Sequence, residues 1–308
     1  MNPILILSFK NSPRIKNLKN RLNNLKLNYK IINGVNARSK KGKSILKKNY
    51  NKKRSEHYLG RKLPYSEMSA PYVHLKAYKY IIKKKIKRAI ILEDDAWPSS
   101  SLKYWVNKKD FNEKVNIIGL NSYDGFVEKK AISLNEKFTI HVAKTHLFNP
   151  ASFIIDYKTC KKIIDNTKGK ICGNSDWPIN FIKNKIISSI SLPYTVAINA
   201  DNISLLAKDR KKAVLTKDRM KATYIKKLIP KSIYNIISFF YYILHIPYLT
   251  GRYPDISFFR EHFYEKKIFS LQNLIFSNLI NTKNIYLNKK FYCKDLWKVV
   301  KNNSFLNL

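Results

Sequence analysis

One pattern at the N-terminus most constrains how this chain can fold. Residues 3–9 (PILILSF) are continuously apolar over the length of a strand buried on both faces. Over residues 15–25 the apolar positions recur every three or four residues, which predicts an amphipathic helix with Ser12 as its N-cap. Residues 29–32 then predict a second strand. A strand, a helix and a strand in this order are typical of a parallel α/β sheet.

The same alternation continues to about residue 205. Further strands are predicted at residues 87–92, 115–120, 138–142, 152–155 and 190–198, and further helices at 66–85, 158–165 and 176–187. Residues 36–56 are polar, basic and hardly periodic, so we expect a mobile loop there. Residues 1–207 are therefore expected to form one α/β domain, a Rossmann-like and mostly parallel sheet flanked by helices.

The C-terminal third of the chain differs in composition. From about residue 208 it is rich in Lys and aromatic residues, and we expect residues 208–308 to form a basic, aromatic-rich helical appendix. Residues 224–263 interleave cations with Tyr and Phe, as at an anionic membrane interface; helices packed on the α/β domain are an equally weighted alternative. The stretch 233–249 approaches transmembrane length, but polar residues and a proline interrupt it, so we expect it to be interfacial or buried.

The charge of the chain is extreme, with 60 Lys+Arg against 20 Asp+Glu and a net charge of +40. Nucleic-acid binding, contact with an anionic membrane and a general compositional bias toward Lys, Asn, Ile and Tyr each explain such an excess. Residues 1–64 carry 18 Lys+Arg and the single acid Glu56, so the excess is spread along the chain. This spread favours the bias. Because the chain has no nucleic-acid-binding motif, we expect no specific nucleic-acid partner.

Cysteines and the N-terminus bear on location. The three cysteines, Cys160, Cys172 and Cys293, are scattered and indicate neither a disulfide framework nor a zinc site. The N-terminal apolar run is too short for a secretory signal. We therefore expect a cytoplasmic protein, peripheral on the inner face of the membrane if the appendix binds lipid.

Three consecutive acids, Glu93-Asp94-Asp95, follow the predicted strand at 87–92 in a chain where acids are scarce. Ligand sites of parallel sheets form at the carboxyl ends of strands. Carboxylates there would bind Mg²⁺ or Mn²⁺, which would in turn bind a diphosphate. The alternative is a surface turn whose carboxylates balance the nearby Lys87 and Arg88.

At this point the residues resemble a known family. Segments 63–67 (LPYSE), 74–78 (HLKAY) and 89–96 (AIILEDDA) resemble the core signature of family 25 glycosyltransferases, which include bacterial lipopolysaccharide and lipooligosaccharide glycosyltransferases and collagen galactosyltransferases. Matches of the same kind, in the same order along the chain, are Arg14, residues 32–37 (INGVNA) and residues 175–177 (SDW). The resemblance covers about residues 3–200.

The chain also departs from the family pattern. Met68-Ser69 and Val73-His74 replace the usual Gly-Cys and Ser-His of the helix after Glu67, and residues 149–153 replace a later Gly-Thr-His-Ala-Tyr pattern. These departures bear on the sugar and the acceptor and leave the expected fold unchanged.

The resemblance implies a GT-A type fold, a nucleotide-sugar donor, a divalent metal and inversion at the anomeric carbon. The leading hypothesis is transfer of a hexose such as galactose from a UDP-sugar to a surface glycan or lipid-linked glycan, with Mn²⁺ or Mg²⁺. The predicted metal ligands are Asp95 and either Glu93 or Asp94, of which Glu93 is preferred. The predicted donor-binding residues are Arg14, Asn36, Glu67 and Asp94. Asp176 is the candidate base that deprotonates the acceptor, with Trp177 as a platform for a sugar ring.

Each role has a structural alternative. Asp176 is also suited to cap a helix, Glu67 to the first turn of one, and Arg14 to a solvated helix surface. His74 lies near an apolar stripe, which favours a satisfied core histidine over a ligand. For the whole protein, the alternatives are a basic nucleic-acid-binding protein and a catalytically inactive, glycan-binding relative.

Overall fold

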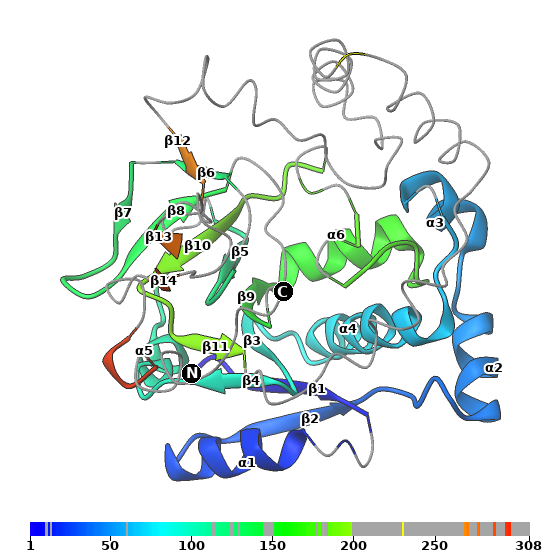
Figure 1. The fold of residues 1–308 in the computed structure, drawn as a ribbon, viewed down its shortest axis with the longest axis horizontal. Helices are drawn as coiled ribbons and strands as arrows, with labels where there is room; N and C mark the ends of the chain where they lie inside the picture. Colours follow the sequence, from blue (N-terminus) through cyan, green and yellow to red (C-terminus); the bar gives the residue numbers. More distant parts are fainter. Residues whose placement is uncertain are drawn as a thin grey trace.

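The N-terminal apolar run forms one of the inner strands of an eight-stranded sheet (Figure 1). The computed structural model describes residues 1–198 except 10–11, 13, 60, 112–114, 123–125, 129, 144–150, 176–177, 180 and 182–183; beyond 198 it describes 230, 268–270, 276–277, 286–287 and 293–296. The helices are α1 (Ile15–Asn24), α2 (Lys40–Lys48), α3 (Lys52–Leu59), α4 (Tyr65–Lys83), α5 (Leu102–Asn107) and α6 (Tyr157–Thr167).

The strands of the large sheet lie in the order β2-β1-β3-β9-β5-β10-β8-β7. Their bounds are β2 (Tyr29–Asn33), β1 (Ile4–Ser8), β3 (Arg88–Glu93), β9 (Ser152–Asp156), β5 (Ile117–Gly119), β10 (Ser188–Leu192), β8 (Thr139–Val142) and β7 (Ile132–Ser133). The paired small strands are β4 (Ala96–Pro98) with β11 (Val196–Ile198), β6 (Phe126–Glu128) with β12 (Ile268–Ser270), and β13 (Phe276–Ser277) with β14 (Tyr286–Leu287).

The large sheet is mixed, with most strands pointing one way. Six of its eight strands share a direction, whereas β9 and β8 run opposite to them. The predicted α/β class and the predicted parallel pairing of β1 with β2 are confirmed. The reversed β9 was not predicted, because a buried strand is apolar in either direction and its sequence does not encode which way it runs.

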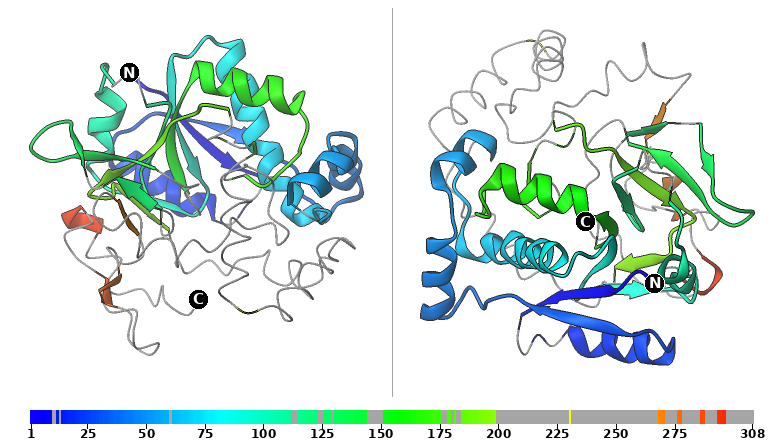
Figure 2. Two further views of the ribbon diagram at one scale, coloured as in Figure 1. Left: turned by 90° about the horizontal axis from the view of Figure 1, so that it is seen from above. Right: turned by 180° about the vertical axis from the view of Figure 1, so that it is seen from behind.

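Both faces of this sheet are buried, and alternate residues of each strand belong to different cores. In β1, Ile4 and Ile6 pack on one side with Leu18 and Leu22 of α1. Leu5 and Leu7 pack on the other side against α4 and α6. Helices α4 and α6 lie side by side on that second face, and α1 lies on the first (Figure 1; Figure 2, left). The result is a three-layer α/β/α arrangement, which explains why the strands read as continuous apolar runs.

Most predicted elements of the first 198 residues are present, but four expectations were wrong. The predicted strand at 190–198 is two strands, β10 and β11, which belong to different sheets. Residues 36–56 contain α2 and most of α3 instead of a loop. The apolar residues of this segment are too few to give a helical pattern. The helices are instead stabilised by packing on the rest of the protein, as the burial of Leu46 shows. Ser12 is not the N-cap of α1; that position is Arg14, and the Ser12 hydroxyl donates to Asp94. The described residues between 178 and 187 form bends and turns, not the predicted helix.

Two short pieces of the C-terminal third contact the α/β body. Strand β12 pairs antiparallel with β6. Cys293 and Leu296 are buried in the same core as α1, and the Asp295 carboxylate accepts hydrogen bonds from Arg21 Nη2 at 3.0 Å and from the Ser100 backbone N–H at 2.7 Å. The rest of the predicted appendix, including 233–249, lies outside the described residues. None of the described helices is long and apolar enough to cross a membrane.

We predict that this docked segment stabilises the whole fold. Leu296 is fully buried, so Leu296→Ala should lower the free energy of unfolding by about 2–4 kcal/mol through lost apolar contact and a cavity. The exposed neighbour Lys294 provides the matched control, and Lys294→Ala should change stability by less than about 0.5 kcal/mol. Urea unfolding of the full-length variants measures both, and equal stabilities would show that the segment contributes nothing.

Candidate functional site

The carboxyl ends of three neighbouring strands place the candidate site on one edge of the sheet. Ser8 at the end of β1 lies in register with Asn33 at the end of β2, and β3, which also pairs with β1, ends at Glu93. The two aspartates that follow form the turn between β3 and β4. The predicted position of the acidic triplet, at the carboxyl end of a buried strand, is therefore confirmed, although Glu93 is the last residue of the strand and not the first residue after it.

Asp94 is the most deeply buried carboxylate of the triplet, with a side chain 5% exposed. Its Oδ2 accepts hydrogen bonds from the Ser8 hydroxyl at 2.9 Å and from the Ser12 hydroxyl at 2.7 Å. Its Oδ1 lies 2.5 Å from Nη2 of Arg14. Both oxygens are thus bound within the protein. The predicted role of Asp94 in donor binding stays a prediction, and the contacts show that it fixes the chain between β1 and α1.

Arg14 joins two carboxylates of the triplet. Its Nη2 pairs with Asp94, and its Nη1 donates to Oδ2 of Asp95 at 2.9 Å. The side chain is 23% exposed, and within the described part of the chain its buried Nε has no hydrogen-bond partner. A guanidinium fork that is partly exposed beside a strand edge is suited to a diphosphate. The structure thus brings together Arg14 and the triplet, which are 79 or more residues apart.

Asp95 experiences an unfavourable environment for its charge. Burial raises the pKa of this carboxyl group to about 7, the charge of Glu93 adds to the increase, and Arg14 opposes it. Its Oδ1 is buried and, among the described residues, has no hydrogen-bond partner. One cation is therefore too few for the three adjacent carboxylates, and Asp95 is the group that is left undercompensated.

Glu93 faces a histidine from the neighbouring helix α4. Its Oε1 lies 3.0 Å from Nε2 of His74. The other ring nitrogen of His74 lies 3.4 Å from the Tyr78 hydroxyl, and the ring stacks on Phe153 with centroids 5.8 Å apart. His74 is buried and both of its ring nitrogens have a partner, as expected for a core histidine. Because one of these partners is Glu93, His74 also orients a carboxylate of the site.

Two further predicted residues lie near this edge without contacting the triplet through any of the described interactions. Glu67, in the first turn of α4, is buried and pairs with Nη1 of Arg61 at 2.6 Å. Asn36 is exposed, and its Oδ1 accepts from the Arg38 backbone N–H at 2.9 Å in the turn before α2. Their donor-binding roles remain predictions. The candidate base Asp176 and its neighbour Trp177 lie outside the described residues.

The sequence did not point to three polar residues at this edge. Ser8 is the last residue of β1, Ser12 was assigned to a helix cap, and Asn121 follows β5, which runs in the same direction as β3. Asn121 is fully buried, and its Oδ1 accepts from the Ser152 backbone N–H at 3.0 Å and hydroxyl at 2.8 Å. In the described structure its Nδ2 has no partner. The only signal in the sequence was a small polar residue within or shortly after an apolar run.

The residues at this edge fit a divalent cation shared with a ligand. Across the described residues, no three His, Cys, Asp or Glu side chains gather as a complete metal site. Mg²⁺, however, is commonly bound by one or two carboxylates together with water and substrate phosphates. The free, buried oxygen of Asp95 provides one such ligand, and the partly exposed Glu93 provides a second. Asp94 does not, because its oxygens are already bound.

Comparison with known families decides the identity of the chain. The family model described as glycosyltransferase family 25 (LPS biosynthesis protein) matches residues 1–180, which is more than half of the chain. The chain belongs to glycosyltransferase family 25. The matched region contains Arg14, Glu67 and the whole acidic triplet. The protein is accordingly an enzyme, a nucleotide-sugar-dependent glycosyltransferase.

Other comparisons add little to this assignment. No curated protein matches the chain. Among solved structures, the inositol-1-phosphate CTP transferase from T. maritima is similar over 69% of this chain and 96% of its own, with 12% sequence identity and a TM-score of 0.33. That score is too low to assign the family 25 enzyme a particular fold type.

The pKa of Asp95 predicts how stability depends on pH. The folded-state pKa of about 7 exceeds the ordinary 3.8, so ionisation of this carboxyl group disfavours folding. The penalty is absent below about pH 4, where both states are protonated, grows between about pH 4 and pH 7, and is complete above about pH 7. In EDTA at pH 8, Asp95→Asn should therefore increase the free energy of unfolding by up to about 4 kcal/mol, because each pKa unit corresponds to about 1.4 kcal/mol. At pH 4 the variant and the wild type should unfold alike. A variant that is less stable than wild type at pH 8 would contradict the increased pKa.

Proposed function

We propose that this family 25 enzyme transfers a hexose, such as galactose, from a UDP-sugar to a lipopolysaccharide, lipooligosaccharide or other surface-glycan acceptor, with inversion at the anomeric carbon. The observation that carries the proposal is the pairing, at one strand edge, of Arg14 with a carboxylate whose second oxygen is buried and free. A cationic fork and a cation-binding carboxylate side by side are the two elements that a nucleotide diphosphate requires.

The chemistry is a displacement. The acceptor hydroxyl oxygen forms a bond to the anomeric carbon while the bond from that carbon to the diphosphate oxygen breaks, and the electron pair of that bond leaves with UDP. Negative charge thus develops on the diphosphate. A Mn²⁺ or Mg²⁺ held by Asp95 and Glu93 would stabilise that charge, and the guanidinium of Arg14 would bind the diphosphate beside it.

The residues around Asp94 preorganise this edge. The two serine hydroxyls and Arg14 fix Asp94, and the turn at 94–95 then fixes the direction in which the Asp95 side chain points. His74 performs the same task for Glu93. These residues act by positioning, since rigid placement of charged groups before binding removes a reorganisation cost from the transition state.

Asp176 is the proposed base. An inverting displacement requires a group on the face of the sugar opposite the diphosphate, where it accepts the proton of the acceptor hydroxyl as the new bond forms. The family resemblance of residues 175–177 supports this role, and Trp177 supplies a surface on which a sugar ring would stack.

The location and the fold type belong to the same proposal. We assign the enzyme a GT-A type arrangement and a cytoplasmic position, where it would meet lipid-linked acceptors at the inner face of the membrane. The mixed sheet with the acidic triplet at a strand end is compatible with this arrangement. In the structure Cys160, Cys172 and Cys293 are free and buried, and burial raises the pKa of each thiol.

A donor screen tests the proposal. With Mn²⁺ and a truncated lipooligosaccharide acceptor, wild type should release UDP from a UDP-hexose, and Asp95→Ala should reduce release at least about a thousandfold, because a cation ligand for the leaving diphosphate is lost. Asp110→Ala, at an exposed aspartate after α5, is the matched control and should retain full activity. Undiminished release by Asp95→Ala, or by wild type in excess EDTA, would contradict the metal role. Donor binding without UDP release would instead indicate an inactive glycan-binding relative.

The role of Asp176 has a separate signature. Asp176→Asn should bind UDP-sugar with wild-type affinity, measured by calorimetry, and should lose about 10²–10⁴-fold in turnover because the acceptor proton has no base. Asp165→Asn, at an exposed position in α6, should change neither quantity. Wild-type turnover in Asp176→Asn would assign the base elsewhere.

A further inference from the structure

The hairpin of α2 and α3 carries a dense, one-signed charge that the fold presents to solvent. Eleven of the 25 residues at positions 38–62 are cationic, against 60 of 308 for the whole chain, and Glu56 is the single acid among them. Exposed cations on and just before α2 are Arg38, Lys40, Lys41, Lys43, Lys47 and Lys48. Helix α3 adds the exposed Lys52 and Lys53. We call these eight residues the cationic face.

The cationic face rests on a well-anchored element. Ser39 caps α2 by accepting from the Gly42 backbone N–H at 3.0 Å, and Leu46 is fully buried against the body. At Gly42 an added Cβ would lie 1.9 Å from the Asn36 carbonyl oxygen, so the first turn of α2 packs closely on the preceding chain. The chain between the two helices is held by hydrogen bonds from Asn51 N–H to Ile171 C=O at 2.9 Å and from Ile171 N–H to Asn49 C=O at 2.8 Å.

The charges of the cationic face have no counterpart in the described structure. Glu56 pairs with Lys62 at 3.9 Å, and Arg61 pairs with Glu67, while all eight cations of the face lack an ion pair with any described residue. Lysines four apart, such as Lys43 and Lys47, repel one another on a helix surface. This face therefore concentrates repulsion on one rigid surface, which an external anionic surface would relieve.

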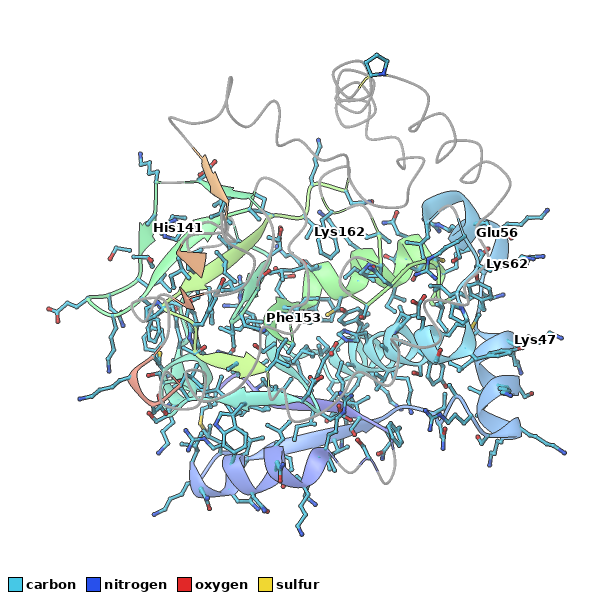
Figure 3. All side chains as sticks on the ribbon, viewed as in Figure 1. Lys47, Glu56, Lys62, His141, Phe153 and Lys162 are labelled. Carbon is cyan, nitrogen blue, oxygen red and sulfur yellow. The ribbon has the colours of Figure 1, made fainter. Side chains whose placement is uncertain are left out.

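The face lies beside the edge that carries the site. Helix α2 follows the carboxyl end of β2 and packs against α4, whose first turn contains Glu67. In Figure 1, α2 and α3 lie together at one end of the molecule, and Figure 3 shows Lys47 and Lys62 projecting outward there. A flat partner bound to this face would lie near the carboxyl ends of the strands, where the site is, and not near their amino ends.

We propose that the cationic face docks the enzyme on an anionic phospholipid bilayer. Seven of its eight cations are lysines, whose compact ammonium groups suit a diffuse layer of lipid phosphates and not the bidentate recognition for which arginine is preferred. No exposed aromatic side chain is interleaved with them in the described part of the hairpin, as stacking on nucleic-acid bases would require. That the docked edge would then meet a lipid-linked acceptor rests on the proposed function; the docking itself does not.

Two variants of equal charge test the orientation. The first replaces Lys40, Lys41, Lys47 and Lys48 with Gln. The second replaces Lys83, Lys84, Lys85 and Lys87, which are exposed at the opposite end of α4, with Gln. Because each lysine at an anionic surface increases binding about fivefold, the first variant should lose about a hundredfold or more in partitioning to vesicles that contain about 30 mol% phosphatidylglycerol at about 0.1 M salt. The second should lose less than about threefold.

The inference fails if both variants lose affinity equally, if the first binds like wild type, or if wild type binds pure phosphatidylcholine vesicles as well as anionic ones. Loss of RNA binding with unchanged vesicle binding in the first variant would assign the face to nucleic acid and also overturn it. Thermal unfolding checks that both variants fold. UDP release with a water-soluble acceptor should be the same in both, so a failed docking prediction remains distinct from a failed glycosyltransferase assignment.

Discussion

The contact between Asp94 and the chain that follows β1 is the interaction on which the site depends. Two serine hydroxyls and the guanidinium of Arg14 converge on one buried carboxylate, and they come from residues 80 or more positions away in the sequence. Charge-assisted hydrogen bonds of this kind are stronger than neutral ones, and a buried carboxylate without them would be strongly destabilising. The end of β3, the end of β1 and the start of α1 are thereby fixed in one arrangement. Everything proposed for Arg14 and Asp95 presupposes that arrangement.

The same contact explains why the triplet contains three acids with unequal environments. Asp94 is satisfied by the protein, Glu93 is oriented by His74, and Asp95 shares one guanidinium with Asp94 and retains a free buried oxygen. A carboxylate with an increased pKa is a liability for folding, because its ionised form is disfavoured in the native state. Such a carboxylate is explained if a ligand brings the positive charge that Asp95 lacks in the protein alone. The site is thus electrostatically incomplete by one cation in the described structure, which is the condition expected of a cation-binding edge.

The sequence predicted the elements whose residues are continuously apolar. It did not predict the features that depend on contacts between distant parts of the chain. The apolar runs at 3–9 and 87–92 predicted β1 and β3, and their polar ends predicted which edge carries the triplet. The α2–α3 hairpin was missed because its apolar residues are few and acquire their weight only by packing on α4. Ser12 was misassigned because a serine just before a helix has two possible partners, a backbone N–H or a distant carboxylate, and local sequence does not distinguish them.

The fold also shows how the charged residues of the chain are distributed in space. Averaged over the sequence, a net charge of +40 is compatible with a general compositional bias, since cations occur throughout. What varies in the fold is the placement of the acids: Glu67, Glu93, Asp94 and Asp95 lie buried or half-buried at the site edge and are paired there, whereas the nearby α2–α3 surface has almost none. Among the described residues, the sign of the field around this edge therefore depends on where the few acids lie, because the cations are spread over the whole sequence. A bias toward lysine would then suffice to produce a docking surface wherever the acids are withdrawn, so the cationic face requires no separate origin from the rest of the excess.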